Sequence, residues 1–290
     1  MKILVLGGDG MLGHQMLKHF TSHHEVRVTL RQDFSQYCAY KLFNSSNAYY
    51  GVDVRSYERL TEVFADFQPD AVINAVGIVK QRSCSRESIP GLELNSLLPH
   101  KLSLLCKLAG ARLVHISTDC VFSGEKGNYV ESDIPDATDL YGRSKVLGEL
   151  TDAHCITLRT SIIGLELARK KSLVEWYLAQ KGEIKGFKKA VYTGVSTSEM
   201  ARIIEFVLLK FPQLHGIWHV ASKPINKYDL LKMLTEKLQR KDVTLQADID
   251  FVCDRSLVGD EFSMRTGYVV PGWNDMINEL VTDIKARGGM

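Results

Sequence analysis

Tyr141 and Lys145 are the residues of this 290-residue chain whose types and spacing best suit proton transfer. They lie four positions apart, so on a helix their side chains share one face. A lysine ammonium close to a phenol stabilises the phenolate and lowers the phenol pKa from its usual value of about 10. Such a phenol can donate its proton to a carbonyl oxygen while a hydride reaches the carbon. The pair therefore predicts a general acid, Tyr141, assisted by Lys145.

Position in the chain distinguishes this pair from three others with the same spacing: Tyr37/Lys41, Tyr177/Lys181 and Tyr228/Lys232. Only Tyr141 begins a helix that follows a strand ending in Ser117-Thr118-Asp119. Ligands of open parallel sheets bind beyond the carboxyl ends of the strands. We therefore expect Thr118 and Tyr141 to face the same ligand, and we interpret the other pairs as helix surface or core edge.

A glycine-rich turn near the start of the chain predicts a dinucleotide site. Residues 7–13 read Gly-Gly-Asp-Gly-Met-Leu-Gly, a GxxGxxG pattern between a predicted strand and a predicted helix. In this context Gly7 permits the tight turn, Gly10 lets the backbone approach a pyrophosphate, and Gly13 allows close helix–strand packing. The phosphates would then lie against N–H groups at the helix start, with Met11 and Leu12 in the turn. The alternative is an ordinary glycine-rich turn.

The residues after the second predicted strand bear on the choice of cofactor. An acid at this position favours NAD, and an arginine accommodates the 2′-phosphate of NADP. Arg31 lies 18 positions after Gly13, and Asp33 lies 20 positions after it. We predict that Arg31 makes the site prefer NADP(H) over NAD(H). The alternative is that Arg31 is a solvated surface charge.

Alternating apolar runs and amphipathic segments must position these residues. The predicted strands are 2–6, 25–30, 70–76, 112–117 and 155–158, and the predicted helices are 11–20, 57–67, 99–109 and 141–150. Apolar strands separated by amphipathic helices indicate a parallel sheet that is buried on both faces, joined by right-handed crossovers. The predicted fold class is α/β, a Rossmann-type doubly wound parallel sheet with a smaller, interleaved C-terminal region.

The pattern loosens after about residue 164. We predict helices at 172–180, 198–211 and 227–238, and a short strand at 216–220 that contains Trp218. We therefore expect residues 1–164 to form the dinucleotide-binding domain and residues 165–290 to form a substrate-binding region. Within that region, about 194–222 should return to the Rossmann sheet.

Composition excludes several classes of protein. The 36 Lys and Arg against 34 Asp and Glu argue against a nucleic-acid partner, which usually requires a basic stripe. The apolar stretches are too short to span a membrane, and those at the start are too short for a secretory signal. The six cysteines form no CxxC pair, and the nine histidines are dispersed. We expect a cytoplasmic protein with reduced thiols, no bound metal and no membrane partner.

The glycine turn, Ser117-Thr118-Asp119 and the Tyr141/Lys145 pair together resemble an extended short-chain dehydrogenase/reductase. Within this group, the chain resembles the dTDP-4-dehydrorhamnose reductases in particular. This likeness is carried by three segments: His-Ile-Ser-Thr-Asp-Cys-Val-Phe-Ser-Gly at 115–124, Tyr-Gly-Arg-Ser-Lys-Val-Leu-Gly-Glu at 141–149 and Leu-Arg-Thr-Ser at 158–161. The resemblance spans most of the chain, and its motifs are strongest before about residue 165.

This resemblance implies a role for each of three catalytic residues. Thr118 would polarise the substrate carbonyl, Tyr141 would donate the proton, and Lys145 would hold the nicotinamide ribose. Besides the glycine turn, Arg31, Tyr141 and Lys145, the implied cofactor contacts are Asp53, Val54, Asn74, Ala75, Val76, Gly77 and Ser117. The implied substrate contacts are Asn95, Thr118, Asp119, Cys120 and Val121. Alternative interpretations remain for Asp53 as a turn residue, Asn74 as a satisfied strand-end amide and Asn95 as a helix-start residue.

Departures from related families narrow the chemistry and leave the substrate open. Related 4,6-dehydratases carry Thr-Asp-Glu where this chain has Thr118, Asp119 and Cys120. A thiol cannot replace the carboxylic acid of that glutamate, so reduction is favoured over dehydration. Residues 77–84 lack the acidic stretch expected of rhamnose-pathway reductases. Residues 174–192 are basic and suit a nucleotide diphosphate, or else form a solvated loop. In that segment we predict substrate contacts at Trp176, Lys185, Phe187 and Tyr192.

The expected function is NAD(P)H-dependent reduction of the 4-keto group of a nucleotide-linked 6-deoxy-hexosulose for glycan precursor synthesis. The nucleotide (dTDP or UDP) and N-acetylation of the sugar remain open. Two other functions also remain open: a non-catalytic NADP-binding regulatory subunit, which the intact Thr118, Tyr141 and Lys145 argue against, and a nucleotide-sugar C4 epimerase. The oligomeric state is open, with a homodimer as one alternative.

Overall fold

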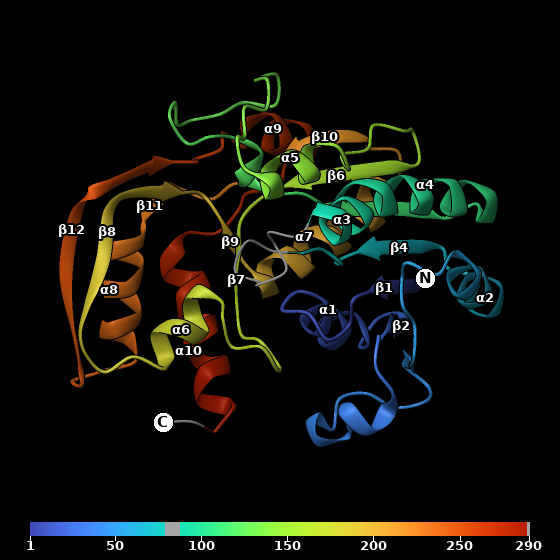
Figure 1. Ribbon diagram of the computed structural model, residues 1–290, viewed down its shortest axis with the longest axis horizontal. Coiled ribbons are helices and arrows are strands. Elements are labelled where there is room, and N and C mark those ends of the chain that lie inside the picture. The colour runs from blue at the N-terminus through green and yellow to red at the C-terminus, as the bar shows by residue number, and fades with distance from the viewer. Residues whose placement is uncertain (79–87, 289–290) are drawn as a thin grey trace. The chain divides into compact units, whose positions relative to one another are not determined.

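The computed structural model describes residues 1–78 and 88–288 (Figure 1). Its chain divides into two compact units. The first unit contains Met1–Ser117, Thr138–Leu158 and Met200–Ile217, and the second contains Thr118–Ala137, Arg159–Glu199 and Trp218–Met290. Both units therefore draw on segments that are distant in sequence, and each is described by itself below.

A seven-stranded sheet in the order β10-β6-β5-β4-β1-β2-β3 organises the first unit (Figure 1). Its strands are β1 Lys2–Leu6, β2 Glu25–Thr29, β3 Ala48–Tyr49, β4 Ala71–Asn74, β5 Arg112–Ile116, β6 Cys155–Arg159 and β10 Gly216–His219. Neighbouring strands from β6 to β3 pair in parallel. Strand β2 lies on one side of β1, and β4 lies on its other side. This reversal of strand order makes the topology doubly wound, with its switch point between β1 and β4. The predicted Rossmann-type fold is confirmed.

Apolar side chains on both faces hold this sheet in place. In β4 all four residues are buried, and in β1 only Lys2 is partly exposed. Leu60, Val63, Phe64 and Phe67 place one face of α2 (Tyr57–Phe67) in the same core. Each such side chain contributes roughly 1.5–3 kcal/mol when it leaves water.

The other helices of the first unit include those that the periodicity predicted, and several of their ends differ from the predicted ones. They are α1 Gly13–Phe20, α3 Ser88–Gly91, the π-helix η4 Leu92–Leu97, α4 Leu98–Ala109, α5 Leu140–Val146 and most of α7 Thr197–Lys210, with 3-10 turns η1 Phe34–Gln36 and η2 Cys38–Tyr40. The helix predicted at 141–150 ends at Val146. The π-helix was not predicted. Gly110, at a φ of +67°, ends α4 in the left-handed conformation that glycine adopts without strain.

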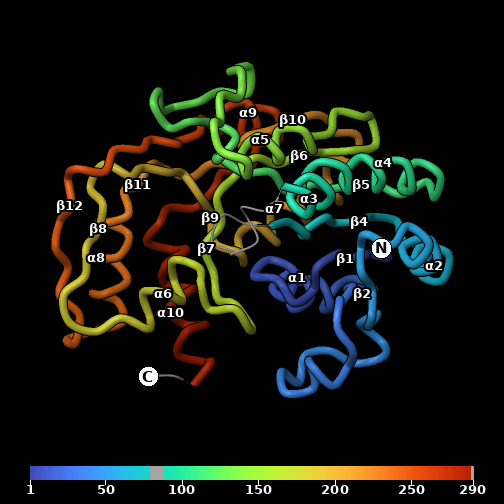
Figure 2. Tube along the Cα trace, in the orientation of Figure 1, coloured from blue at the N-terminus to red at the C-terminus, as the bar shows by residue number. Residues whose placement is uncertain are grey.

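The second unit is built around a three-stranded sheet in the order β11-β8-β12, shown in Figure 2. Its elements are η5 Asp119–Val121, β7 Ile162–Ile163, α6 Leu173–Leu178, β8 Gly182–Tyr192, β9 Val195–Ser196, β11 Ile225–Asn226, α8 Lys227–Lys237, β12 Val243–Asp254, α9 Asp260–Thr266 and α10 Trp273–Ala286. Strand β12 runs parallel to β8 with a register shift between Asp248 and Val252. Helix α8 packs on β8 and contacts α10.

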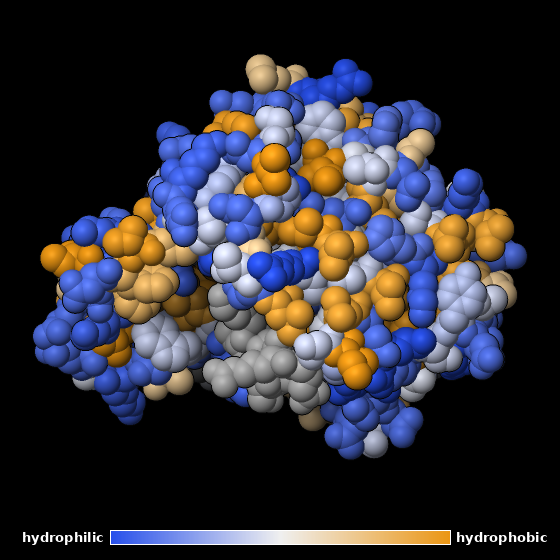
Figure 3. All heavy atoms as spheres, turned by 45° about the horizontal axis from the view of Figure 1, so that its top comes forward, coloured by the Kyte–Doolittle hydropathy of each residue, from blue (hydrophilic) through white to orange (hydrophobic). Residues whose placement is uncertain are grey.

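None of the described helices is both long and apolar enough to cross a membrane. On the face shown in Figure 3, apolar residues form small separate groups among polar and charged ones. Single exposed apolar side chains such as Leu108 (83% exposed) and Ile134 (86% exposed) are common on protein surfaces.

Candidate active site

The glycine turn after β1 leaves little room for side chains. Gly7 has a φ of +85°, and a Cβ on Gly13 would lie 2.1 Å from the Gly7 carbonyl oxygen, so neither position tolerates a side chain. A Cβ on Gly8 would lie 2.5 Å from Val28, a constraint that the sequence analysis missed. Among the described residues, a Cβ on Gly10 would meet only the Gly7 oxygen within 4 Å, so this side of the Gly10 backbone is otherwise open.

The turn is anchored to its neighbours on both sides. Gly7 N–H donates to Thr29 Oγ1 at 3.2 Å, and Gly8 N–H donates to the Thr29 carbonyl at 3.0 Å. On the other side, the Cβ position of Gly7 lies 3.0 Å from Val76 Cγ2 and 3.4 Å from the Ala75 oxygen. The predicted cofactor residues Ala75 and Val76 therefore lie against the glycine turn.

The amide of Asn74 is engaged inside the protein. This residue is 1% exposed; its Nδ2 lies 3.1 Å from His115 Nδ1, and its Oδ1 accepts a hydrogen bond from Val76 N–H at 3.2 Å. These contacts shape the end of β4. Gly77 follows, where a Cβ would lie 3.2 Å from Asn95 Oδ1.

Lys145 is a buried cation at the end of β5. It is 5% exposed, and its Nζ donates to the Ile116 carbonyl at 2.7 Å and lies 3.4 Å from His115 Nε2. Burial lowers the pKa of Lys145 to about 8, although the charge of Glu149 opposes this shift. Burial and the Lys145 charge hold the pKa of His115 well below its usual value, so the imidazole is neutral. Lys145 thus carries the positive charge of this cluster, one turn after the half-buried Tyr141.

The short helix α5, which carries Tyr141 and Lys145, is positioned by η4. Asn95 Nδ2 donates to Ser144 Oγ at 3.1 Å, and Ser96 Oγ donates to the Ser144 carbonyl at 2.8 Å. Asn95 also exchanges hydrogen bonds with the backbone of Ile78 at 2.9 and 3.1 Å. A Cβ on Gly148 would lie 1.9 Å from the Asn95 carbonyl, so only glycine allows this approach. The contacts of Asn95 are those of a positioning residue, and sequence reasoning did not find Ser96, Ser144 or Gly148.

Thr118 begins the second unit directly after Ser117, which donates to Glu149 at 2.7 Å within the first unit. Thr118 Oγ1 accepts from Cys120 N–H and donates to Asp119 Oδ1, both at 3.1 Å. The other oxygen of Asp119 accepts from Ser161 Oγ at 2.6 Å. Burial and the Asp119 charge raise the pKa of Cys120 to about 12, so its thiol stays protonated at neutral pH. Val121 is fully buried.

The basic segment of the second unit is engaged mainly with its own sheet and helices. Lys185 pairs with Asp248 at 3.5 Å, and the Phe187 ring lies 5.0 Å from that of Phe251. Trp176 is 38% exposed. Tyr192 is buried edge-on against a tryptophan ring 5.5 Å away, and its hydroxyl has no hydrogen-bond partner among the described residues. Burial, and secondarily the charge of Asp119, raises its pKa.

The end of the sheet where the sequence predicts the adenosine carries charges of both signs. Arg31 is exposed after β2, and Asp53 and Val54 are half-buried after β3. Hydrogen bonds from Arg55, and more weakly the charge of Arg31, lower the pKa of Asp53 below its usual value. Arg31 and Asp53 are therefore close enough to interact. The predicted departure at residues 77–84 falls largely outside the described residues.

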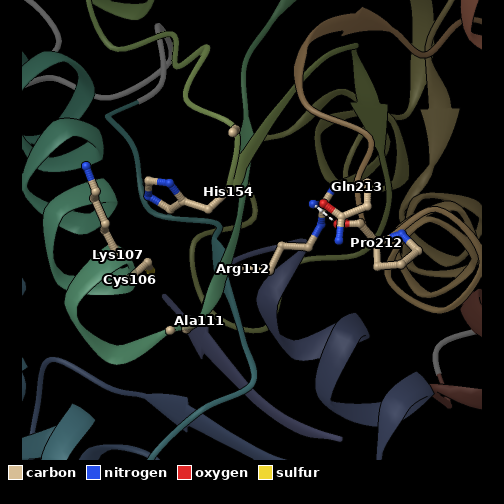
Figure 4. Close-up of a pocket in the computed structure, with 9 residues that line it drawn as sticks. Cys106, Lys107, Ala111, Arg112, His154, Pro212 and Gln213 are labelled. Carbon is tan, nitrogen blue, oxygen red and sulfur yellow. Dashed lines mark hydrogen bonds between the residues drawn. The ribbon is translucent and has the colours of Figure 1, made fainter.

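A pocket of about 370 Å³ lies at the opposite edge of the sheet, where β5 and β6 begin (Figure 4). Arg112 donates there to the carbonyls of Pro212 and Leu214. Nearby, the ligand atoms of Asp152, His154 and Cys155 lie within 4.8 Å of one another, a cluster that sequence reasoning missed. Ser103 Oγ lies within hydrogen-bonding distance of all three side chains, so they form a hydrogen-bonded group. Active sites of this fold lie at the carboxyl edge, away from this pocket.

Known proteins share both the sequence pattern and the fold. The chain is 28% identical to the spore coat polysaccharide biosynthesis protein SpsK of Bacillus subtilis over 231 residues, which cover 77% of this chain and 74% of that protein. It is 26% identical to a dTDP-4-dehydrorhamnose reductase of Aggregatibacter actinomycetemcomitans over 239 residues, covering 79% and 76%. It is also 25% identical to methionine adenosyltransferase 2 subunit beta of Danio rerio, covering 79% and 71%. The crystal structure of a dTDP-4-dehydrorhamnose reductase from Clostridium acetobutylicum has the same fold, with a TM-score of 0.80, 22% identity and coverage of 98% and 100%.

These relatives and the Rossmann-type sheet place the chain in the class of NAD(P)-dependent oxidoreductases of the short-chain dehydrogenase/reductase type, by sequence pattern and by fold. Within that class, a family model described as RmlD substrate binding domain matches residues 1–250. The chain belongs to this family, which confirms the likeness to dTDP-4-dehydrorhamnose reductases.

Proposed function

We propose that this protein uses NADPH to reduce the 4-keto group of a nucleotide-linked 6-deoxy-hexosulose during glycan precursor synthesis. The observation that carries the proposal is the buried Lys145 ammonium, fixed 2.7 Å from the Ile116 carbonyl, one helical turn after Tyr141. Membership in the RmlD family and the likeness to two proteins named for polysaccharide and rhamnose chemistry support this substrate class.

The chain's own residues divide the chemistry between them. Tyr141 donates its hydroxyl proton to the C4 oxygen, and the Lys145 ammonium stabilises the phenolate that remains. In the reaction the Thr118 hydroxyl gives up its hydrogen bond to Asp119 and donates one to the same oxygen, where negative charge develops. The nicotinamide, when bound, supplies the hydride that C4 receives. One hydride and one proton convert the ketone to an alcohol, and solvent returns the proton to Tyr141.

Several residues fit the cofactor and support its binding. The open side of the Gly10 backbone suits a pyrophosphate, and Arg31 suits a 2′-phosphate, which is why NADPH is proposed over NADH. Lys145 would also hold the nicotinamide ribose. Cys120 stays a neutral thiol, so the chain offers no carboxylic acid beside Asp119 for elimination of water.

The test is turnover by purified protein with NADPH and a panel of dTDP- and UDP-linked 4-keto-6-deoxy sugars, with and without an N-acetyl group. Tyr141→Phe should lower kcat by roughly 10²- to 10⁴-fold and leave NADPH affinity unchanged within about twofold. The matched control is Tyr228→Phe, because Tyr228 precedes Lys232 by the same four residues on α8. Full activity in Tyr141→Phe would disprove the catalytic assignment.

The similarity to methionine adenosyltransferase 2 subunit beta favours a second candidate, a regulatory subunit that binds a dinucleotide without turnover. The same panel separates the two functions. Tight NADPH binding without oxidation on any sugar nucleotide would favour the regulatory role, and turnover that depends on Tyr141 would exclude it.

A further inference from the structure

Four charged side chains lie at the carboxyl ends of β2 and β3, where the adenosine half of a dinucleotide binds in this fold. Arg31 and Asp33 follow β2, whereas Asp53 and Arg55 follow β3. Their formal charges cancel. The arrangement of these charges, rather than their sum, must therefore decide whether this edge accepts a phosphate.

Backbone hydrogen bonds hold the two strand ends side by side. Gly51 N–H donates to the Gln32 carbonyl at 3.1 Å, and Val52 N–H donates to the Leu30 carbonyl at 2.9 Å. The four charges are thus carried by two adjacent loops that continue a parallel pair of strands.

Arg55 engages both carboxylate oxygens of Asp53. Its Nε lies 3.0 Å from Oδ1 and 3.1 Å from Oδ2, and its Nη2 lies 2.5 Å from Oδ2. The backbone N–H of Arg55 donates to Oδ1 as well, at 3.0 Å. A planar guanidinium that binds a carboxylate at two points holds it more firmly than a single contact would.

Arg31 is the other cation that acts on Asp53. Its charge contributes to the low pKa of Asp53, yet within residues 1–78 and 88–288 its guanidinium makes no hydrogen bond or ion pair. Because Arg55 already occupies the Asp53 oxygens, Arg31 is left exposed and available to an anion.

We propose that Arg55 is a specificity-determining residue that makes the site accept NADPH by acting as the counter-ion of Asp53. The inference rests on the proposed dinucleotide binding and adds a second arginine to the choice of cofactor. Without Arg55, the Asp53 carboxylate competes with the 2′-phosphate for Arg31 and repels that phosphate. The 2′-hydroxyl of NADH carries no charge, so its binding depends much less on Arg55.

The test measures dissociation constants of NADPH and NADH for the wild-type protein and four variants, with no sugar substrate present. Adenosine 2′,5′-bisphosphate and AMP serve as probes of the 2′-phosphate alone. The variants are Arg55→Gln, Asp53→Asn, the double variant, and Arg59→Gln as a matched control. Arg59 is a nearby arginine on α2 that pairs at 2.5 Å with Glu62 instead.

Arg55→Gln should weaken NADPH binding about tenfold relative to NADH, a loss expected for one uncompensated charge near a surface phosphate. The double variant should regain NADPH affinity to within about threefold of wild type, because the carboxylate that Arg55 neutralises is gone. Asp53→Asn should keep the ratio of NADPH to NADH affinity at or above that of wild type, because any contact of Asp53 with the shared part of the dinucleotide affects both equally. Arg59→Gln should leave the ratio of the two affinities unchanged.

Two results would overturn the counter-ion role while leaving the proposed function intact. One is an unchanged ratio in Arg55→Gln. The other is a double variant as weak as Arg55→Gln, since Arg55 would then act on the phosphate directly. Failure of the wild-type protein to bind either dinucleotide would instead refute the proposed function, and this inference with it. Asp53→Asn keeps the test informative if Arg55→Gln does not fold.

Discussion

Lys145→Met should abolish a pH dependence of stability that the buried ammonium creates. Burial lowers the pKa of Lys145 from 10.5 to about 8. One pKa unit corresponds to about 1.4 kcal/mol, so the folded protein disfavours this charge by about 3 kcal/mol. Methionine has a similar length and is apolar, so it fits a buried position and has no proton to lose.

The sign of the effect follows from proton binding by the two states. Below pH 8, the folded and unfolded states both keep the proton of Lys145, and the contribution is constant. Between pH 8 and 10.5, the folded state has lost the proton while the unfolded state retains it. The unfolded state then binds more protons, so the free energy of unfolding rises with pH. Relative to Lys145→Met, the wild-type protein should gain about 3 kcal/mol over this interval.

The assay is urea unfolding of both proteins in parallel over a series of pH values that spans both pKa values. Groups that titrate equally in the two proteins cancel in the difference. The matched control is Lys232→Met, because Lys232 is 57% exposed at the same spacing after a tyrosine and should show no such difference. A flat difference between wild type and Lys145→Met through this interval would refute the claim that Lys145 is desolvated in the folded protein.

Three further substitutions test the positioning of the site. Gly13→Ala would put a Cβ 2.1 Å from the Gly7 oxygen and should reduce NADPH affinity by at least about tenfold in a titration. The control Gly91→Ala meets none of the described residues within 4 Å and should be neutral. Asn95→Leu would leave the buried backbone N–H and carbonyl of Ile78 without their Asn95 partners. It should therefore lower the free energy of unfolding by about 2–4 kcal/mol. It should also reduce kcat more than it raises the KM for NADPH. Cys120→Ser should retain kcat within about threefold in the same turnover assay, because a protonated thiol takes no part in proton transfer. A large loss of kcat in Cys120→Ser would count against its assigned neutrality.

The sequence predicted the Rossmann-type sheet because β1 and β4 are almost wholly apolar runs without alternation, a pattern typical of strands buried on both faces. Strand β12 was not predicted, since most of its residues are exposed and its pattern does not alternate regularly. The π-helix η4 has no sequence periodicity that would reveal it. Helix α10 was also not predicted, although Trp273, Met276, Ile277 and Leu280 recur at helical spacing and could have identified it.

Long sequence separations hid other parts of the site. The sequence predicted Lys145 from its distance to Tyr141, but it did not predict the buried His115 beside Lys145, 30 residues earlier. The histidines also looked dispersed along the chain. In the structure, His19 and His24 both contact Glu205, at 2.8 and 2.9 Å, across more than 180 residues. Contacts of this kind depend on how helices and strands pack, which local patterns do not specify.

The four Tyr/Lys pairs show why spacing alone was insufficient. Tyr37 and Lys41 flank the 3-10 turn η2, and Lys41 has a φ of +52°. Helix α6 ends at Leu178, before Lys181 is reached. Neither pair therefore shares a helical face. The pair on α8 does so, but the Lys232 side chain is 57% exposed, and solvent weakens the interactions of such a charge.

A seven-residue helix such as α5 is too short to be stable by itself, so other segments must fix the positions of Tyr141 and Lys145. Asp139 caps its start by accepting from Gly142 N–H at 2.9 Å. Asn95 holds its middle, and its end is close to η4 only because residue 148 is glycine. The Tyr/Lys spacing therefore places the two side chains only because η4, about 50 residues earlier in the chain, holds α5 in position. Proteins that share the spacing without an equivalent of Asn95 and Gly148 should lack the same alignment of phenol and ammonium.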